Sequence, residues 1–209
     1  TISYTVTNAN GCETAVTLPV TINSLPIVTV INGTDNACIG KTTQLSNPTS
    51  GGVWSSSAPA VATVDATGLV AGLTAGTTTI SYTVTNANGC ETAVTLAVTI
   101  NALPSLPVVT QTNPSCGTAT GSISITAVAG ETYSVDGSAY TATLTYAGLA
   151  PGVHSVMAKS VDGCISAGTE VTIGAVKVAG VKPVVTQTNP VCGTATGSIS
   201  ITAVAGETY

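Results

Sequence analysis

The sequence predicts an all-β protein built from tandem β-sandwich domains. Thr and Val, whose β-branched side chains favour strands, contribute 39 and 27 of the 209 residues. The 22 Gly and 10 Pro suit frequent turns between short strands, and the chain contains no Phe and no Arg. Two long segments also occur twice, which is typical of an array of repeats.

The two duplications set the expected domain boundaries. Residues 79–104 repeat residues 1–26 at a spacing of 78, and residues 183–209 repeat residues 107–133 at a spacing of 76. The copies differ only at Pro19/Ala97, Ser24/Ala102 and Ser115/Val191. We therefore expect the end of a first-kind domain, a whole first-kind domain, a whole second-kind domain and the start of another. In that order they span residues 1–26, 27–104, 105–182 and 183–209.

Charge and hydropathy exclude several classes of partner. Only 6% of the residues are charged and the net charge is −5, which opposes nucleic acid and anionic membrane surfaces. Polar Thr, Ser and Gly interrupt every apolar run before the ~20 residues that a membrane helix needs. We expect no nucleic-acid partner and no membrane span.

Residues 1–26 predict a β-hairpin. Apolar and polar residues alternate on both sides of the Asn8–Gly11 turn, so one face should be buried and the other solvated. Residues 27–104 show strand patterns separated by Gly-containing turns, including Asn32-Gly33. Seven short strands so spaced predict a two-sheet sandwich of immunoglobulin type. The expected strands are 27–31, 42–46, 53–57, 61–64, 69–71, 79–85 and 92–100.

The same segment resembles a known family. Val53-Trp54-Ser55-Ser56-Ser57, Val61-Ala62-Thr63-Val64-Asp65, Gly68-Leu69-Val70, Gly76 and Thr79-Ile80-Ser81-Tyr82 resemble the bacterial immunoglobulin-like group 2 domain of surface adhesins. Cys38 and Cys90 resemble the variant repeated in large secreted proteins of Bacteroidota. The resemblance implies that Trp54, which could alternatively stack on a sugar ring, is a core residue.

Residues 105–182 predict a second β-sandwich of immunoglobulin-like type. The order of Cys116-Gly117, Gly121-Ser122-Ile123, Gly148-Leu149-Ala150-Pro151-Gly152 and Asp162-Gly163-Cys164 resembles the repeats of giant adhesins in gliding Bacteroidota. The linkers 101–107 and 175–183 are short and contain proline, so we expect them to be semi-rigid. The expected strands are 108–111, 122–128, 132–135, 142–146, 153–160 and 170–173.

Catalytic and metal chemistry find little support. The single histidine, His154, has no second imidazole beside it, and Ser55–Ser57 lack a nucleophile elbow. The aspartates stand singly beside turns, where Asp bonds its own backbone, and the cysteines lack Cys-x-x-Cys spacing. We expect no enzyme, no catalytic residue, no metal and no cofactor. The aspartates in question are Asp35, Asp65, Asp136 and Asp162.

The six cysteines fall into two sets. Cys38, Cys116 and Cys192 precede a second strand, whereas Cys12, Cys90 and Cys164 follow an Asn-Gly or Asp-Gly turn. We predict disulfides within each whole domain, Cys38–Cys90 and Cys116–Cys164, formed in an oxidising compartment. A strict immunoglobulin topology would place these partners at opposite ends of the sandwich, and the competing model pairs Cys38 with Cys164.

These observations predict a structural role. An array of disulfide-bearing sandwiches suits the shaft of a very large secreted adhesin, associated with the outer membrane at the cell surface, that projects a distal binding region. The resemblance to gliding adhesins implies a role in motility and attachment. Its partners would be neighbouring repeats, with surface glycans or cell-surface proteins bound through regions outside this sequence. The alternatives are a carbohydrate-binding module and the accessory repeats of a secreted polysaccharide-degrading enzyme.

Overall fold

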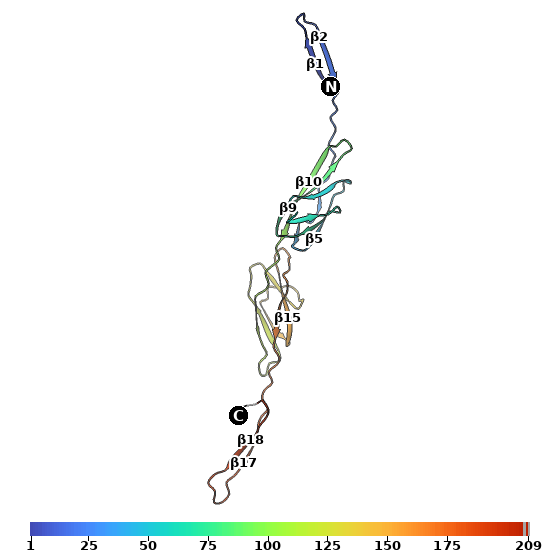
Figure 1. The fold of residues 1–209 in the computed structure, drawn as a ribbon. Coiled ribbons are helices and arrows are strands. Elements are labelled where there is room, and N and C mark those ends of the chain that lie inside the picture. The colour runs from blue at the N-terminus through green and yellow to red at the C-terminus, as the bar shows by residue number, and fades with distance from the viewer. Residues whose placement is uncertain (207, 209) are drawn as a thin grey trace. The chain divides into compact units, whose positions relative to one another are not determined.

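The computed structural model describes residues 1–206 and 208, and their regular structure consists of strands (Figure 1). No α-helix occurs among these residues, which confirms the predicted all-β class. Accordingly, the described residues include no helix long and apolar enough to cross a membrane. The chain divides into two compact units. The first contains Thr1–Leu103 and Asp162–Cys164, and the second contains the other described residues.

The first unit contains a β-sandwich of two four-stranded sheets. One sheet has the order β4-β10-β9-β6 and the other has the order β3-β5-β8-β7. Neighbouring strands are antiparallel except for β4, which runs parallel to β10. The strands are β3 (Asn32–Gly33), β4 (Asn36–Cys38), β5 (Thr42–Ser46), β6 (Val53–Ser56), β7 (Ala62–Val64), β8 (Leu69–Gly72), β9 (Gly76–Thr85) and β10 (Glu91–Asn101).

Alternating side chains of these strands form the core of the sandwich. Along β9, Thr78, Ile80, Tyr82 and Val84 are buried while the residues between them are more exposed, as a period of two requires. The buried apolar cluster comprises Ala37, Leu45, Ala62, Val70, Ile80, Val98 and Ile100.

The first strand expected in this sandwich is not present. Residues 27–31 form no strand. A side chain, and not a neighbouring strand, bonds their backbone: Asn47 Nδ2 donates to the Thr29 carbonyl at 2.8 Å. Asn32-Gly33, expected as a turn, forms β3 beside β5. Gly33 has a φ of 133°, and a Cβ there would collide with the Gln44 carbonyl, so this pairing requires glycine.

The second unit contains a sandwich of two three-stranded antiparallel sheets, β11-β12-β14 and β13-β15-β16. Each expected strand is present: the one at 132–135 has the expected bounds, and the bounds of the other five are shifted. The strand expected at 142–146 starts later, at Thr145, and Thr141 just before the expected start forms an isolated bridge to Tyr133. The strands are β11 (Val109–Thr112), β12 (Gly121–Ile125), β13 (Thr132–Val135), β14 (Thr145–Leu149), β15 (Gly152–Lys159) and β16 (Thr169–Ile173).

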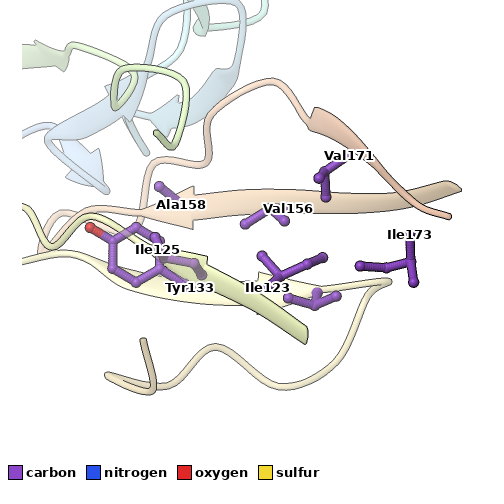
Figure 2. Packing of buried hydrophobic residues seen from close by; sticks show 8 residues of the cluster. Ile123, Ile125, Tyr133, Val156, Ala158, Val171 and Ile173 are labelled. Carbon is purple, nitrogen blue, oxygen red and sulfur yellow. The ribbon is translucent and has the colours of Figure 1, made fainter. Parts of the chain in front are cut away.

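The core of this sandwich lies between its two sheets. Figure 2 shows Tyr133 of β13 and Val156 of β15 near Ile123 and Ile125 of β12. The Tyr133 ring is 1% exposed, and its hydroxyl accepts the Val128 N–H at 2.8 Å, which satisfies the phenol inside the core. The buried cluster comprises Ile123, Ile125, Tyr133, Val135, Val156, Ala158, Val171 and Ile173.

Two further hairpins stand outside these cores. β1 (Ile2–Thr7) pairs with β2 (Glu13–Leu18), and β17 (Val184–Thr188) pairs with β18 (Ser198–Thr202). The hairpin predicted in residues 1–26 is confirmed, but its expected buried face is not. Every residue of β1 and β2 is exposed, because among the described residues no second sheet covers them.

Candidate functional site

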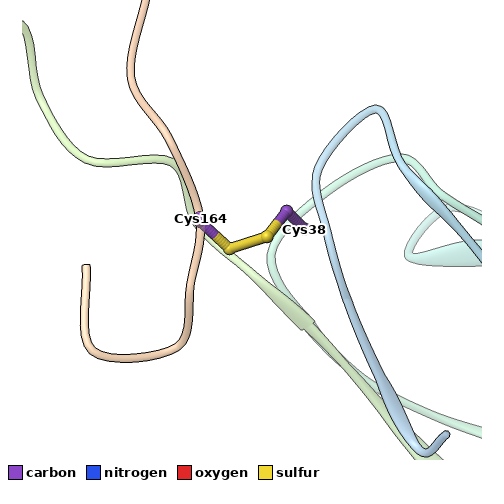
Figure 3. The surroundings of a disulfide bond; sticks show 2 residues. All are labelled: Cys38 and Cys164. Carbon is purple, nitrogen blue, oxygen red and sulfur yellow. A yellow bond between two sulfur atoms is a disulfide. The ribbon is translucent and has the colours of Figure 1, made fainter. Parts of the chain in front are cut away.

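A disulfide joins Cys38, at the end of β4, to Cys164, in the turn between β15 and β16 (Figure 3). The two Cα atoms lie 5.6 Å apart although 126 positions separate them in sequence. Cys164 is 1% exposed, and the short segment that carries it, Asp162–Cys164, belongs to the first unit. The predicted pairs Cys38–Cys90 and Cys116–Cys164 are therefore not those of the structure. The competing pairing of Cys38 with Cys164 is the one observed.

The length of β10 explains why Cys38 does not pair with Cys90. Cys38 lies beside Asn101, the last residue of β10, and the Ile39 N–H donates to the Asn101 carbonyl at 3.1 Å. Cys90 precedes Glu91, the first of the 11 residues of β10. At ~3.3 Å per residue the two cysteines lie ~35 Å apart, whereas a disulfide bridges at most ~7 Å between Cα atoms.

The same obstacle separates Cys116 from Cys164. The Thr169 hydroxyl donates to the Pro107 carbonyl at 3.1 Å, and the Gly174 N–H donates to Asn113 Oδ1 at 2.7 Å. The segment 107–113 thus runs alongside β16 for ~20 Å at ~3.3 Å per residue. Cys164 lies before Thr169 and Cys116 lies after Asn113, so these cysteines stand at opposite ends of the second sandwich.

Residues that are far apart in the sequence line one polar hollow in the first unit. Asp35, Asn36, Thr99, Asn101 and Asp162 line a cavity of about 360 Å³. Both aspartates were predicted to act singly in turns, and no local pattern linked them because they are far apart in sequence. Two carboxylates fall short of a metal site: no group of three or more His, Cys, Asp or Glu suited to a metal occurs in the described part of the chain.

His154 forms an ion pair with Asp136, which the sequence did not predict. His154 Nδ1 lies 2.7 Å from Asp136 Oδ2, and Nε2 lies 2.9 Å from the Ala150 carbonyl. Asp136 also serves its predicted turn role, with a φ of 52° and Oδ1 accepting the Ser155 N–H at 2.9 Å. The imidazole is 12% exposed and lies at the boundary of the fold, as predicted.

The contacts of this pair shift the pKa values of both His154 and Asp136. The hydrogen bond to Asp136, followed by the bond to the Ala150 carbonyl, raises the pKa of His154 above its ordinary 6.5. The hydrogen bond from His154, followed by that from the Ser155 N–H, lowers the pKa of Asp136 below 3.8. With a carbonyl on one ring nitrogen and a carboxylate on the other, the imidazole can donate at both and act as a cationic clasp.

The other singled-out side chains have structural contacts. Trp54 is half-buried against the first core, with its ring centroid 4.7 Å from that of Tyr82, which supports the core interpretation over a sugar platform. Asp65 Oδ1 accepts the Thr67 N–H at 2.8 Å, the Thr67 hydroxyl at 2.7 Å and the Leu69 N–H at 3.0 Å. These bonds, the Thr67 hydroxyl first, lower the pKa of Asp65 and confirm its predicted turn role.

One family model matches part of the chain. It is described as bacterial Ig-like domain (group 2), and it matches residues 19–95. This description agrees with the resemblance that the first sandwich sequence carries. A search of curated proteins found no match to the chain.

Several solved structures are similar to the chain at low identity. The surface layer protein SbsC, domains 1-6, is 16% identical with a TM-score of 0.34, covering 78% of this chain and 30% of that one. The fibronectin(III)-like modules of Clostridium thermocellum CbhA are also 16% identical, with a TM-score of 0.35, covering 71% and 95%. Bacteroides ovatus SGBP-B, solved with a mixed-linkage heptasaccharide, is 14% identical with a TM-score of 0.23, covering 86% and 47%. The chain thus spans under a third of the SbsC structure.

Proposed function

We propose that this chain is part of the structural shaft of a very large secreted adhesin that projects a distal binding region from the cell surface. The observation that carries the proposal is the succession of two sandwiches, each with its own buried core, together with the Cys38–Cys164 disulfide. Repeats of this kind can be added in whole units without refolding their neighbours, which suits a structure selected for length. The resemblance to gliding adhesins further supports a role in motility and attachment.

The proposed domain boundaries are those of the repeats: 1–26, 27–104, 105–182 and 183–209. The two core clusters support them, because one lies within residues 37–100 and the other within residues 123–173. The two exposed hairpins support them as well, since each copies a segment that is covered by a second sheet elsewhere in the chain. Each hairpin would then belong to a further sandwich.

The proposed location is extracellular and associated with the outer membrane. A structural disulfide with one partner 1% exposed is typical of oxidising compartments. The proposed role is not enzymatic. Its support is that both ring nitrogens of His154 have structural partners, Nδ1 the Asp136 carboxylate and Nε2 the Ala150 carbonyl, so neither contacts a nucleophile.

Scattering and electron microscopy of a chain of several repeats test the shaft. With strands of ~6 residues at ~3.3 Å plus loops, each domain should add ~35 to 45 Å of length. The expected result is a thin particle whose longest dimension grows in proportion to the number of repeats. A compact particle, or a coil with no preferred angle between domains, would contradict the proposal.

Glycan binding separates the shaft from the carbohydrate-binding alternative. We expect residues 1–209 to bind no glycan tightly, because Trp54 is half-buried against the first core and packs on Tyr82. Binding on a glycan array that is lost in Trp54→Ala, with the strand content unchanged, would support the alternative instead. Trp54→Phe serves as the matched control for the folded sandwich.

A further inference from the structure

We infer that Cys38–Cys164 is one instance of a pairing rule, in which the early cysteine of each repeat bonds to the turn cysteine of the repeat that follows. Early cysteines precede the second main strand, and turn cysteines lie in the last hairpin. Cys116 and Cys90 are then halves of two further crosslinks. This inference rests on the repeat order proposed above and does not depend on the adhesive role.

The early cysteines lie at the downstream end of each sandwich, where the chain leaves it. Cys38 is beside Asn101, after which the chain runs into the linker 102–107. Cys116 follows Asn113, whose side chain binds the Gly174 N–H immediately after β16. Both early cysteines therefore stand close to the point of exit.

The turn cysteines lie at the opposite, upstream end, where the chain enters. Cys90 Sγ lies 4.0 Å from the carbonyl of Asn23, and the neighbouring Asn86 Nδ2 donates to the Ser24 carbonyl at 2.8 Å. In the second sandwich, Ile165 beside Cys164 bridges to Lys159, at the end where Thr169 binds Pro107. The incoming chain therefore passes the hairpin turn in both kinds of repeat.

This arrangement leaves each early cysteine without a partner in its own sandwich and directs it to the next one. Where one repeat follows another, the exit of the first and the entrance of the second are joined by a short linker. The disulfide Cys38–Cys164 is a bond of this kind: Cys38 is the early cysteine of residues 27–104, and Cys164 is the turn cysteine of residues 105–182. Cys116 is exposed, and its position corresponds to that of Cys38.

The bond that the rule requires is an ordinary disulfide. Two thiols lose two protons and two electrons as their sulfurs join. A small-molecule disulfide, or the disulfide of an oxidoreductase, accepts them and is reduced to two thiols. For Cys116 the second thiol is the turn cysteine of a following second-kind repeat. For Cys90 it is the early cysteine of a preceding first-kind repeat.

Extending the chain by one repeat tests the rule for Cys116. A copy of residues 134–182 added after Tyr209 completes the second-kind repeat that starts at Pro183. The added copy carries its equivalent of Val161, an 81% exposed residue, as Thr so that its peptide has a distinct mass. The oxidised protein is alkylated and cleaved after Lys and Glu without reduction, which separates Cys38, Cys90, Cys116 and Cys164 into different peptides.

The expected result is a crosslink between the Cys116 peptide and the mass-tagged turn peptide, alongside the crosslink of Cys38 to Cys164. The matched control replaces the added turn cysteine with Ser, whereupon Cys116 should be alkylated while Cys38–Cys164 persists. A Cys116–Cys164 crosslink, or an alkylated Cys116 in the fully extended chain, would overturn the rule. The same mapping of the natural secreted protein provides an independent check, since free thiols at Cys90 and Cys116 there would overturn it as well.

Discussion

The hairpins β1–β2 and β9–β10 have nearly the same sequence and the same turn, yet one is exposed and the other forms part of a core. Asn8 Oδ1 accepts the Asn10 and Cys12 N–H groups at 3.0 Å, and Asn86 Oδ1 accepts the equivalent two at 3.0 Å. Ile2 is nevertheless 64% exposed whereas Ile80 is fully buried. The comparison shows that the hairpin is specified locally and that burial depends on a second sheet.

The tyrosines of the two hairpins differ in the same way. The Tyr82 hydroxyl donates to the Thr49 carbonyl at 2.6 Å and accepts the Gly52 N–H at 2.9 Å, so it ties the loop before β6 to the core. Its ring covers Gly52, where a Cβ would collide with it. Tyr4, at the equivalent place, is 72% exposed. A single side chain thus anchors a loop in one copy and is solvated in the other.

The largest expected effect on stability concerns the cysteines, because Cys38 and Cys164 form a disulfide whereas Cys116 and Cys192, which are equivalent to Cys38, do not. Replacing Cys38 and Cys164 together with Ala should lower the free energy of unfolding by ~4 to 5 kcal/mol on the chain-entropy estimate for a loop of this length. Replacing Cys116 and Cys192, whose thiols are free in residues 1–209, should change it little. Chemical denaturation of the oxidised proteins measures both. Equal losses in the two double variants would refute the assigned pairing.

The hairpin comparison is tested by Ile80→Ala against Ile2→Ala. Truncating the fully buried Ile80 should cost ~2 to 5 kcal/mol, because it removes apolar contacts and leaves a cavity. Truncating the exposed Ile2 should cost no more than about 0.5 kcal/mol. Thermal or denaturant unfolding followed by Trp54 fluorescence reports on the first sandwich. A similar loss in both variants would show that the hairpin β1–β2 is covered in solution.

The second duplicated segment allows a milder test. Ile123 is fully buried in the second core and Ile199, its copy in β18, is 72% exposed. Ile123→Val should destabilise the second sandwich by ~0.5 to 1.5 kcal/mol, the usual cost of removing one buried methylene. Ile199→Val should be neutral. Hydrogen exchange resolves the two segments in one experiment, and faster exchange in β12 after the Ile199 change would contradict the comparison.

The smallest expected effect is the pH dependence that the pair of His154 and Asp136 gives to the stability of its own sandwich. Because the pKa of folded His154 is raised, its contribution is fully present below pH 6.5, its ordinary value, and is lost as pH rises through the folded pKa. Because the pKa of folded Asp136 is lowered, its contribution is present above pH 3.8 and is lost as pH falls through the folded value.

The pair should therefore stabilise most between about pH 4 and pH 6.5. Unfolding measured from below about pH 4 to above about pH 6.5 should show a maximum between these values that disappears in His154→Gln, while Asp65→Asn leaves it in place. If stability varied with pH in the same way in the wild type and in His154→Gln, the pair would not be the source of the maximum. The hairpin β17–β18 contains no Asp, Glu, Lys or His and should show no such dependence.

The sequence alone determined the features that depend on near neighbours. The period of two predicted β9 and β10, the Asn-Gly turns predicted both first-kind hairpins, and Asp65 and Asp136 took their predicted turn roles. Duplication predicted that β1–β2 and β9–β10 share one pairing register, because equal sequences adopt equal local geometry. One exception was residues 27–31, where the distant Asn47 side chain bonds the Thr29 carbonyl in place of a neighbouring strand. Another was Asn32-Gly33, which forms β3 and not the predicted turn.

The tertiary structure decided which distant residues meet. Equivalent places in the repeats suggested that Cys38 pairs with Cys90, but an 11-residue strand holds those two apart and places Cys38 beside Asn101 instead. The tertiary structure also places His154 beside Asp136, and it places Asp35 in the hollow that Asp162 lines. Periodicity specifies the face on which a side chain lies, whereas the end of the sandwich at which it lies depends on strand length and pairing, and only the assembled sheets fix both.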